Sequence, residues 1–134
     1  MTSINLKTIF EERYEKLPPP LQESFFDPLI AKTIWRIAQL NNLPEDKVSL
    51  LTQNISKVFL GLIHYNDFGK IIAEELNLNP LSAQTIAQEI DREIFLPIRK
   101  YLRQVYSFFG PIERPLLVSE TPQEIKKEEV PSKL

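Results

Sequence analysis

Apolar residues recur along this chain at intervals of three and four, and no stretch alternates steadily between apolar and polar positions. Five segments carry the pattern, and prolines, asparagines or glycines separate them. Such spacing predicts amphipathic helices that each bury one face, and it predicts no strand. We therefore expect an all-α protein. The clearest apolar stripes are Val48, Leu51, Ile55, Val58, Phe59 and Leu62, and Ile86, Ile90, Ile94, Ile98, Leu102 and Val105.

Prolines mark where the predicted helices begin and end. Three consecutive prolines at 18–20 end the first segment, because proline cannot continue a helix. Asp27-Pro28 and Asn79-Pro80 each place an N-cap residue before a proline at the first helical position, where the missing N–H is not needed. Pro97 falls inside the last apolar stripe, which keeps its phase on both sides. That stretch reads as one kinked helix ending at Gly110-Pro111, with two abutting helices as the alternative.

The chain matches itself at an offset of 35 residues. Residues 37–63 align without a gap to residues 72–98, and each copy reads as a helix, an Asn-Leu corner and a longer helix. We expect two similar helix-corner-helix units packed in a compact bundle of five or six helices. Whether the identities reflect duplication or chance among amphipathic helices stays open. The seven identical pairs are Ile37/Ile72, Ala38/Ala73, Asn42/Asn77, Leu43/Leu78, Gln53/Gln88, Ile55/Ile90 and Ile63/Ile98.

Residues 111–134 differ from the rest of the chain. They hold four prolines and closely spaced charges of both signs, and their apolar residues lack a period. Such a segment has too little apolar surface to offset the entropy of ordering it. We therefore expect a helical domain at residues 1–110 and a flexible tail at residues 111–134. The one apolar cluster of the tail is Leu116, Leu117 and Val118, which is either a chance cluster or a docking motif for a protein partner.

The composition favours a single-domain globular protein and gives little support for disulfide-rich, membrane-spanning or nucleic-acid-binding classes. A length of 134 residues with 43% hydrophobic residues suits one domain with its own core. Cysteine is absent, which excludes a disulfide framework. We see no signal peptide and no apolar run of bilayer length, so we expect no membrane span and a cytoplasmic protein. A net charge of −2 gives little support for bulk nucleic-acid binding.

Candidate catalytic and metal-binding groups are sparse. His64 is the only histidine, so neither a His/Cys metal set nor a Cys–His nucleophile can be assembled. We expect His64 to interact with exposed carbonyls at the end of the helix before it. Glu89 and Glu93 flank the apolar stripe, so we expect them at the solvated surface. No glycine-rich phosphate loop is present. The sequence therefore predicts neither an enzyme nor a bound cofactor or metal.

Two features bear on nucleic-acid binding. Residues 72–86 have the spacing of a helix-turn-helix motif, but the entrance of its second helix carries no basic residue and acidic residues follow. The last helix does carry a basic stretch, Arg99, Lys100 and Arg103. It serves either as a solvated helix face or as a binding site for an anionic partner. Nucleic-acid binding through this face is the alternative function that the sequence leaves.

The motifs from Leu17 to Tyr106 resemble short, uncharacterised helical proteins of reduced-genome, candidate-phylum bacteria. The features that carry the resemblance are Leu17-Pro18, the corner from Ile37 to Leu43, Gly61-Leu62-Ile63, and the run from Ile86 to Ile98. No function is assigned to that group, so the resemblance implies an origin and no mechanism.

Elimination leaves a non-enzymatic protein–protein interaction or scaffold module. Trp35, Phe25 and Phe26 are expected in the core, and if exposed they would anchor a partner well. The identity of the protein partner is not encoded in any motif, and self-association stays open.

Overall fold

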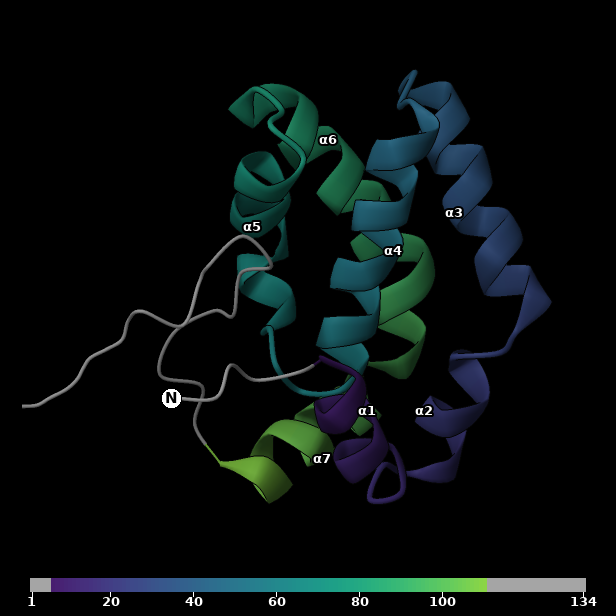
Figure 1. Ribbon diagram of the computed structural model, residues 1–134, viewed down its shortest axis with the longest axis vertical. Helices are drawn as coiled ribbons and strands as arrows, with labels where there is room; N and C mark the ends of the chain where they lie inside the picture. The colour runs from purple at the N-terminus through teal and green to yellow at the C-terminus, as the bar shows by residue number, and fades with distance from the viewer. Residues whose placement is uncertain (1–5, 111–134) are drawn as a thin grey trace, which may run out of the picture.

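The computed structural model describes residues 6–110, and these form helices joined by short turns, with no strand among them (Figure 1). The expected all-α fold is confirmed. The tail predicted at residues 111–134 lies outside the described residues. The α-helices are α1 (Leu6–Tyr14), α2 (Pro19–Ser24), α3 (Pro28–Leu40), α4 (Glu45–Phe59), α5 (Phe68–Glu75), α6 (Pro80–Ile90) and α7 (Arg99–Phe109).

The central helices form the bundle, and the remaining ones close one end of it. Helix α4 packs against α3 and α5, and α6 packs against the same two helices. In Figure 1, α4 lies between α3 and α5 with α6 behind, while α1, α2 and α7 lie together at the lower end. Helix α2 contacts α7 there. A short 3-10 turn, η1 (Tyr65–Asp67), leads into α5.

The core is continuous from the bundle to the closed end. Phe95 is fully buried, and its ring packs edge-on against the rings of Phe59 and Phe68 at centroid distances of 6.4 and 5.1 Å. All three rings are buried, as are Ile55 and Ile90. Burying a side chain of this size contributes about 1.5–3 kcal/mol. The predicted apolar stripes therefore form the inner faces of the helices.

The two predicted corners have the same conformation. Asn42 has φ 57° and Asn77 has φ 54°, which is the left-handed region that asparagine tolerates better than most residues. In each corner the next N–H closes the helix end: Leu43 N donates to Ala38 O and Leu78 N to Ala73 O, both at 2.9 Å. This pattern is a Schellman motif. The offset of 35 residues thus corresponds to two similar helix-corner-helix units.

The two units differ after their second helix. Helix α4 ends at Phe59, and Gly61 then turns the chain with φ +79°. Gly61 therefore lies beyond the helix, and its missing side chain lets Val105 of α7 approach closely. In the second unit the chain stays helical through a π-helical turn, η2 (Asp91–Phe95), and a 3-10 turn, η3 (Leu96–Ile98).

Residues 80–109 thus form one interrupted helix, which agrees with the predicted kinked helix. Pro97 has no N–H to donate to the preceding turn. The regular α-helical hydrogen bonds are therefore interrupted, and a π-helical and a 3-10 turn replace them around Pro97. Ile98 has φ −115° and ψ 16°, outside the helical range, so the direction of the chain changes there. If residues 80–109 are counted as one helix, the described part of the chain contains six helices. None of the described helices has the length and hydropathy needed to cross a bilayer.

Candidate functional site

Two of the three aromatic residues expected in the core are exposed. Phe26 is 72% exposed and Trp35 is 48% exposed, and the neighbouring Leu29 is 68% exposed. Only Phe25 follows the expectation in part, since it is half-buried with its ring 5.4 Å from that of Phe59. Because Phe26 and Trp35 are exposed, both are available to anchor a partner.

The position of Trp35 follows from how α3 begins. Asp27 caps the helix, and its Oδ1 accepts a hydrogen bond from Leu29 N at 2.9 Å. From that start, Ile34 and Ile37 face the core. Each residue turns the helix by about 100°, so Trp35 projects beside the core-facing stripe rather than into it.

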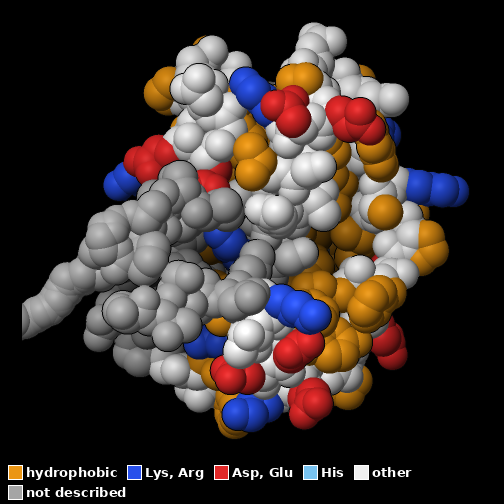
Figure 2. Space-filling model, in the orientation of Figure 1, with side chains coloured by type: hydrophobic (Ala, Val, Ile, Leu, Met, Phe, Trp, Pro, Cys, Tyr) orange, Lys and Arg blue, Asp and Glu red, His pale blue; other side chains and the backbone are white. Residues whose placement is uncertain are grey.

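Trp35 borders an apolar groove between α2, α3 and α4, which we call the Trp35 groove. Its volume is about 220 Å³. In Figure 2, hydrophobic side chains gather along the side of the molecule that these helices form. Eight of its lining residues are apolar and four are polar. The residues that line it are Ser24, Phe25, Asp27, Ile30, Ala31, Ile34, Trp35, Val48, Thr52, Ile55, Ser56 and Phe59.

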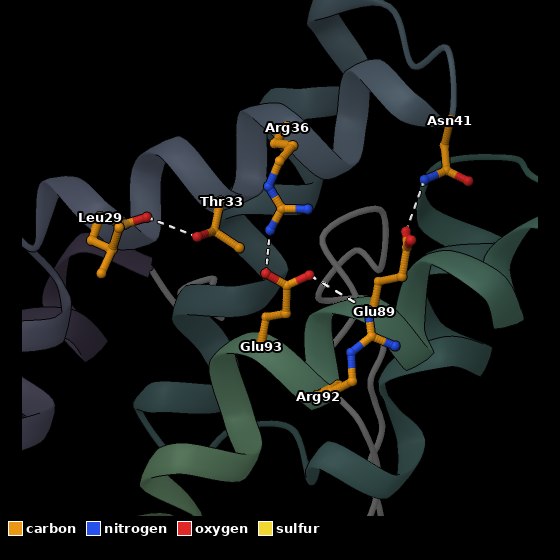
Figure 3. Close-up of polar contacts among 7 residues, drawn as sticks. All are labelled: Leu29, Thr33, Arg36, Asn41, Glu89, Arg92 and Glu93. Atoms are coloured by element: carbon orange, nitrogen blue, oxygen red, sulfur yellow. Dashed lines mark hydrogen bonds and ion pairs between the residues drawn. The ribbon is translucent and has the colours of Figure 1, made fainter.

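Polar contacts hold α3 against α6 and η2 (Figure 3). Arg36 forms an ion pair with Glu93, which also lies 3.5 Å from Arg92. Further along, Asn41 Nδ2 donates to Glu89 Oε1 at 3.1 Å. The expectation that Glu89 and Glu93 lie at the solvated surface is therefore wrong in part, because both are half-buried and pair across helices. These contacts fix the helix that carries Trp35.

The basic residues of α7 do not act as one free patch. Both carboxylate oxygens of Asp91 accept hydrogen bonds from Arg99 Nη2 at 2.8 Å, and the Arg99 guanidinium lies 4.7 Å from the centre of the Tyr65 ring. Lys100 and Arg103 are exposed, and Lys100 lies against Tyr101. Arg99 is therefore already neutralised, and the basic face reduces to Lys100 and Arg103.

His64 has a structural role different from the expected one. Its Nδ1 accepts a hydrogen bond from Asn66 N at 3.0 Å, so it caps the turn η1 instead of meeting the carbonyls of the preceding helix. Its ring stacks on Tyr106 at 4.6 Å. The Tyr106 hydroxyl donates to Ile63 O at 2.9 Å, and burial raises the pKa of this phenol above its ordinary value. Within residues 6–110, no three His, Asp or Glu side chains come together as a metal site.

A second cavity, which nothing in the sequence singled out, lies between α1 and α4. We call it the α1–α4 pocket; its volume is about 380 Å³. Lys57 is only 2% exposed there, and desolvation lowers its pKa while Glu75 raises it. A buried lysine is not signalled by an amphipathic pattern, which treats charged residues as solvent-facing. The pocket is lined by Lys7, Phe10, Thr52, Gln53, Ser56, Lys57 and Leu60.

None of the known protein families, curated proteins or solved structures is significantly similar to the chain. The resemblance to helical proteins of candidate-phylum bacteria therefore stays a prediction, and function has to be argued from the geometry of the described residues.

Proposed function

We propose that this protein is a non-enzymatic protein-interaction module that binds its partner at the Trp35 groove. The observation that carries the proposal is the exposed Trp35 ring in the lining of the groove. Phe26 and Leu29 are exposed close to Asp27 in the chain, and Asp27 also lines the groove. Large apolar side chains scattered singly over a surface need no explanation, but a group of them beside a cavity is typical of an interaction site.

The chemistry of the groove indicates what it would hold. Its buried wall is aliphatic and aromatic, with Ile34, Ile55 and Phe59 among the lining residues. Tryptophan is enriched among residues that dominate binding energy, because one ring removes a large apolar area from water at a low entropic cost. We therefore propose that the partner supplies one or two apolar side chains from a helix or an extended segment, placed between Trp35 and α4.

The nucleic-acid alternative has less support. Arg99 forms an ion pair with Asp91, so only Lys100 and Arg103 of the basic stretch remain exposed to bind phosphates. Binding through so few phosphates would be weak and strongly dependent on salt. Binding of duplex DNA or RNA at micromolar concentration that weakens with salt, and that Lys100→Ala with Arg103→Ala reduces, would favour it over the Trp35 groove.

Affinity capture with matched variants tests the proposal. The full-length chain and its Phe26→Ala/Trp35→Ala variant are used as baits in lysate of the source cells, and bound proteins are identified by mass spectrometry. The control is Leu81→Ala/Phe108→Ala, which removes two other exposed apolar side chains, from α6 and α7. Loss of a central anchor costs about 2 kcal/mol or more, roughly 30-fold in affinity.

The expected result is a partner retained by the wild type and the control and lost by the groove variant. A direct titration with the purified partner then gives the change in Kd. If the same partner binds the groove variant with unchanged affinity, the Trp35 groove is not the binding site.

A further inference from the structure

The α1–α4 pocket has the size and chemistry of a site for aliphatic side chains. A cavity of about 150 Å³ lined by apolar residues accepts a benzene molecule, so about 380 Å³ has room for two aliphatic side chains. Phe10 of α1 and the buried Leu60, which directly follows α4, contribute apolar surface, and Lys7 and Lys57 are among the lining residues. The occupant that fits is a short apolar segment.

The described part of the chain ends next to this pocket. The ring of Phe109, the last residue of α7, lies 4.0 Å from the Arg13 guanidinium, and Arg13 Nη1 donates to Leu60 O at 2.9 Å. Leu60 lines the pocket. The C-terminal end of α7 is therefore joined to the edge of the pocket through a single arginine.

Gly110 redirects the chain at that point. Its N–H still bonds to Tyr106 O at 3.0 Å, but its φ of +90° breaks the helix. A side chain at Gly110 would meet nothing within 4 Å, so the backbone angle and not packing requires glycine there. The chain thus leaves α7 by a turn rather than by continuing along the helix axis.

The segment that follows matches the pocket. From Gly110 to Leu116 the chain can span up to ~20 Å when extended, which is enough to reach across a pocket of this size. The apolar triplet at 116–118 is bordered by Glu113, Arg114 and Glu120, and the lining of the pocket includes Lys7 and Lys57. We propose that Leu116, Leu117 and Val118 occupy the α1–α4 pocket of their own chain.

This docking differs from the role expected from the sequence, in which the triplet binds a partner protein. It also places the tail beside the proposed partner site, because Thr52 and Ser56 line both the α1–α4 pocket and the Trp35 groove. A docked tail would form one wall of that groove. The inference does not depend on the proposed function, since it concerns contacts within one chain.

Because the chain has no cysteine, introduced thiols can report the contact. The full-length Gln53→Cys/Leu117→Cys variant places one thiol at the exposed, pocket-lining Gln53 and one in the triplet. The control, Gln39→Cys/Leu117→Cys, uses an equally exposed glutamine on α3. Disulfide formation is followed in dilute protein in a glutathione buffer, with intact mass and non-reducing electrophoresis as readouts.

We expect an intramolecular disulfide to form at least tenfold faster in the pocket variant than in the control. Equal rates in the two variants would overturn the proposal. Disulfide-linked dimers formed faster than the intramolecular bond would overturn it as well, because the occupant would then be the tail of a second copy.

Thermal unfolding of the full-length chain gives a second, independent readout. Replacing all three residues of the triplet with serine should lower Tm by about 5 °C or more, because apolar contacts with the pocket are lost. Ile125→Ser/Val130→Ser is the matched control outside the triplet and should leave Tm unchanged. An unchanged Tm in the triplet variant would overturn the proposal. Neither readout involves a partner, so failure of the Trp35 groove as a partner site would leave both unaffected.

Discussion

Replacing Gly61 with alanine tests how closely α7 packs on the turn after α4. Two costs arise at this position. The backbone has φ +79°, where an L-residue with a Cβ loses roughly 1–2 kcal/mol. The new Cβ would also lie 2.6 Å from Val105 Cγ1, and overpacking of a buried site costs about 1–3 kcal/mol. We expect Gly61→Ala to lower the free energy of unfolding by about 2–5 kcal/mol, a large share of the 5–15 kcal/mol typical of a domain.

Urea denaturation followed by far-UV circular dichroism measures this change, and two further variants separate its causes. Gly110→Ala also requires a positive φ, but its Cβ would lie in open space, so it should cost less than Gly61→Ala. Val105→Ala makes room for the new methyl group, so it should cost less in the Gly61→Ala background than in the wild type. If the effects of Gly61→Ala and Val105→Ala add within about 0.5 kcal/mol, the two residues are not coupled and the reasoning fails.

Three other changes test the corners, the buried phenol and the contact between α3 and η2. Asn42→Ala and Asn77→Ala should each cost about 1 kcal/mol or more, and by nearly equal amounts, because both corners need a positive φ; unequal urea midpoints would show that the corners differ energetically. The raised pKa of Tyr106 means that the unfolded chain releases this proton first as pH rises above about 10, so stability present below that pH should be lost above it, and less so in Tyr106→Phe by denaturation at pH 8–11. Glu93→Gln removes the partly exposed ion pair with Arg36 and should cost under about 1 kcal/mol, with the loss shrinking in 1 M salt; a salt-independent loss would point to packing instead of charge.

Most of the helices and their ends could be predicted from the sequence because the signals act within one turn. Helix α2 was missed, because the prolines at 18–20 were predicted only to end the first segment, whereas Pro19 and Pro20 are the first residues of α2. The expected caps at Asp27 and Asn79 are present, with Asp27 Oδ1 accepting from Leu29 N and Asn79 Oδ1 from Ser82 N at 2.9 and 2.8 Å. The matching corners followed from the repeated Asn-Leu pair, since asparagine tolerates the left-handed conformation that ends a helix. Even the interruption near Pro97 was local, because it depends on one missing N–H.

The pairing of charged residues could not be read from the sequence. Arg36 and Glu93 are 57 residues apart, and Asn41 and Glu89 are 48 residues apart. An amphipathic pattern shows that such residues lie beside an apolar stripe, but not which helix covers that edge. The burial of Lys57 was missed for the same reason, since it depends on how α4 packs against its neighbours.

Exposure of the aromatic residues was likewise decided by the tertiary structure. Periodicity identifies the apolar face of a helix, whereas exposure depends on how far neighbouring helices extend over that face. Helix α3 packs against α4 and α6, and none of the described elements covers Trp35 completely. The sequence therefore determined that α3 is an amphipathic helix, but it placed Trp35 in the core, which is wrong. Only the packing of α2, α3 and α4 left that tryptophan beside an open groove, because their spacing sets how much apolar surface stays in contact with water.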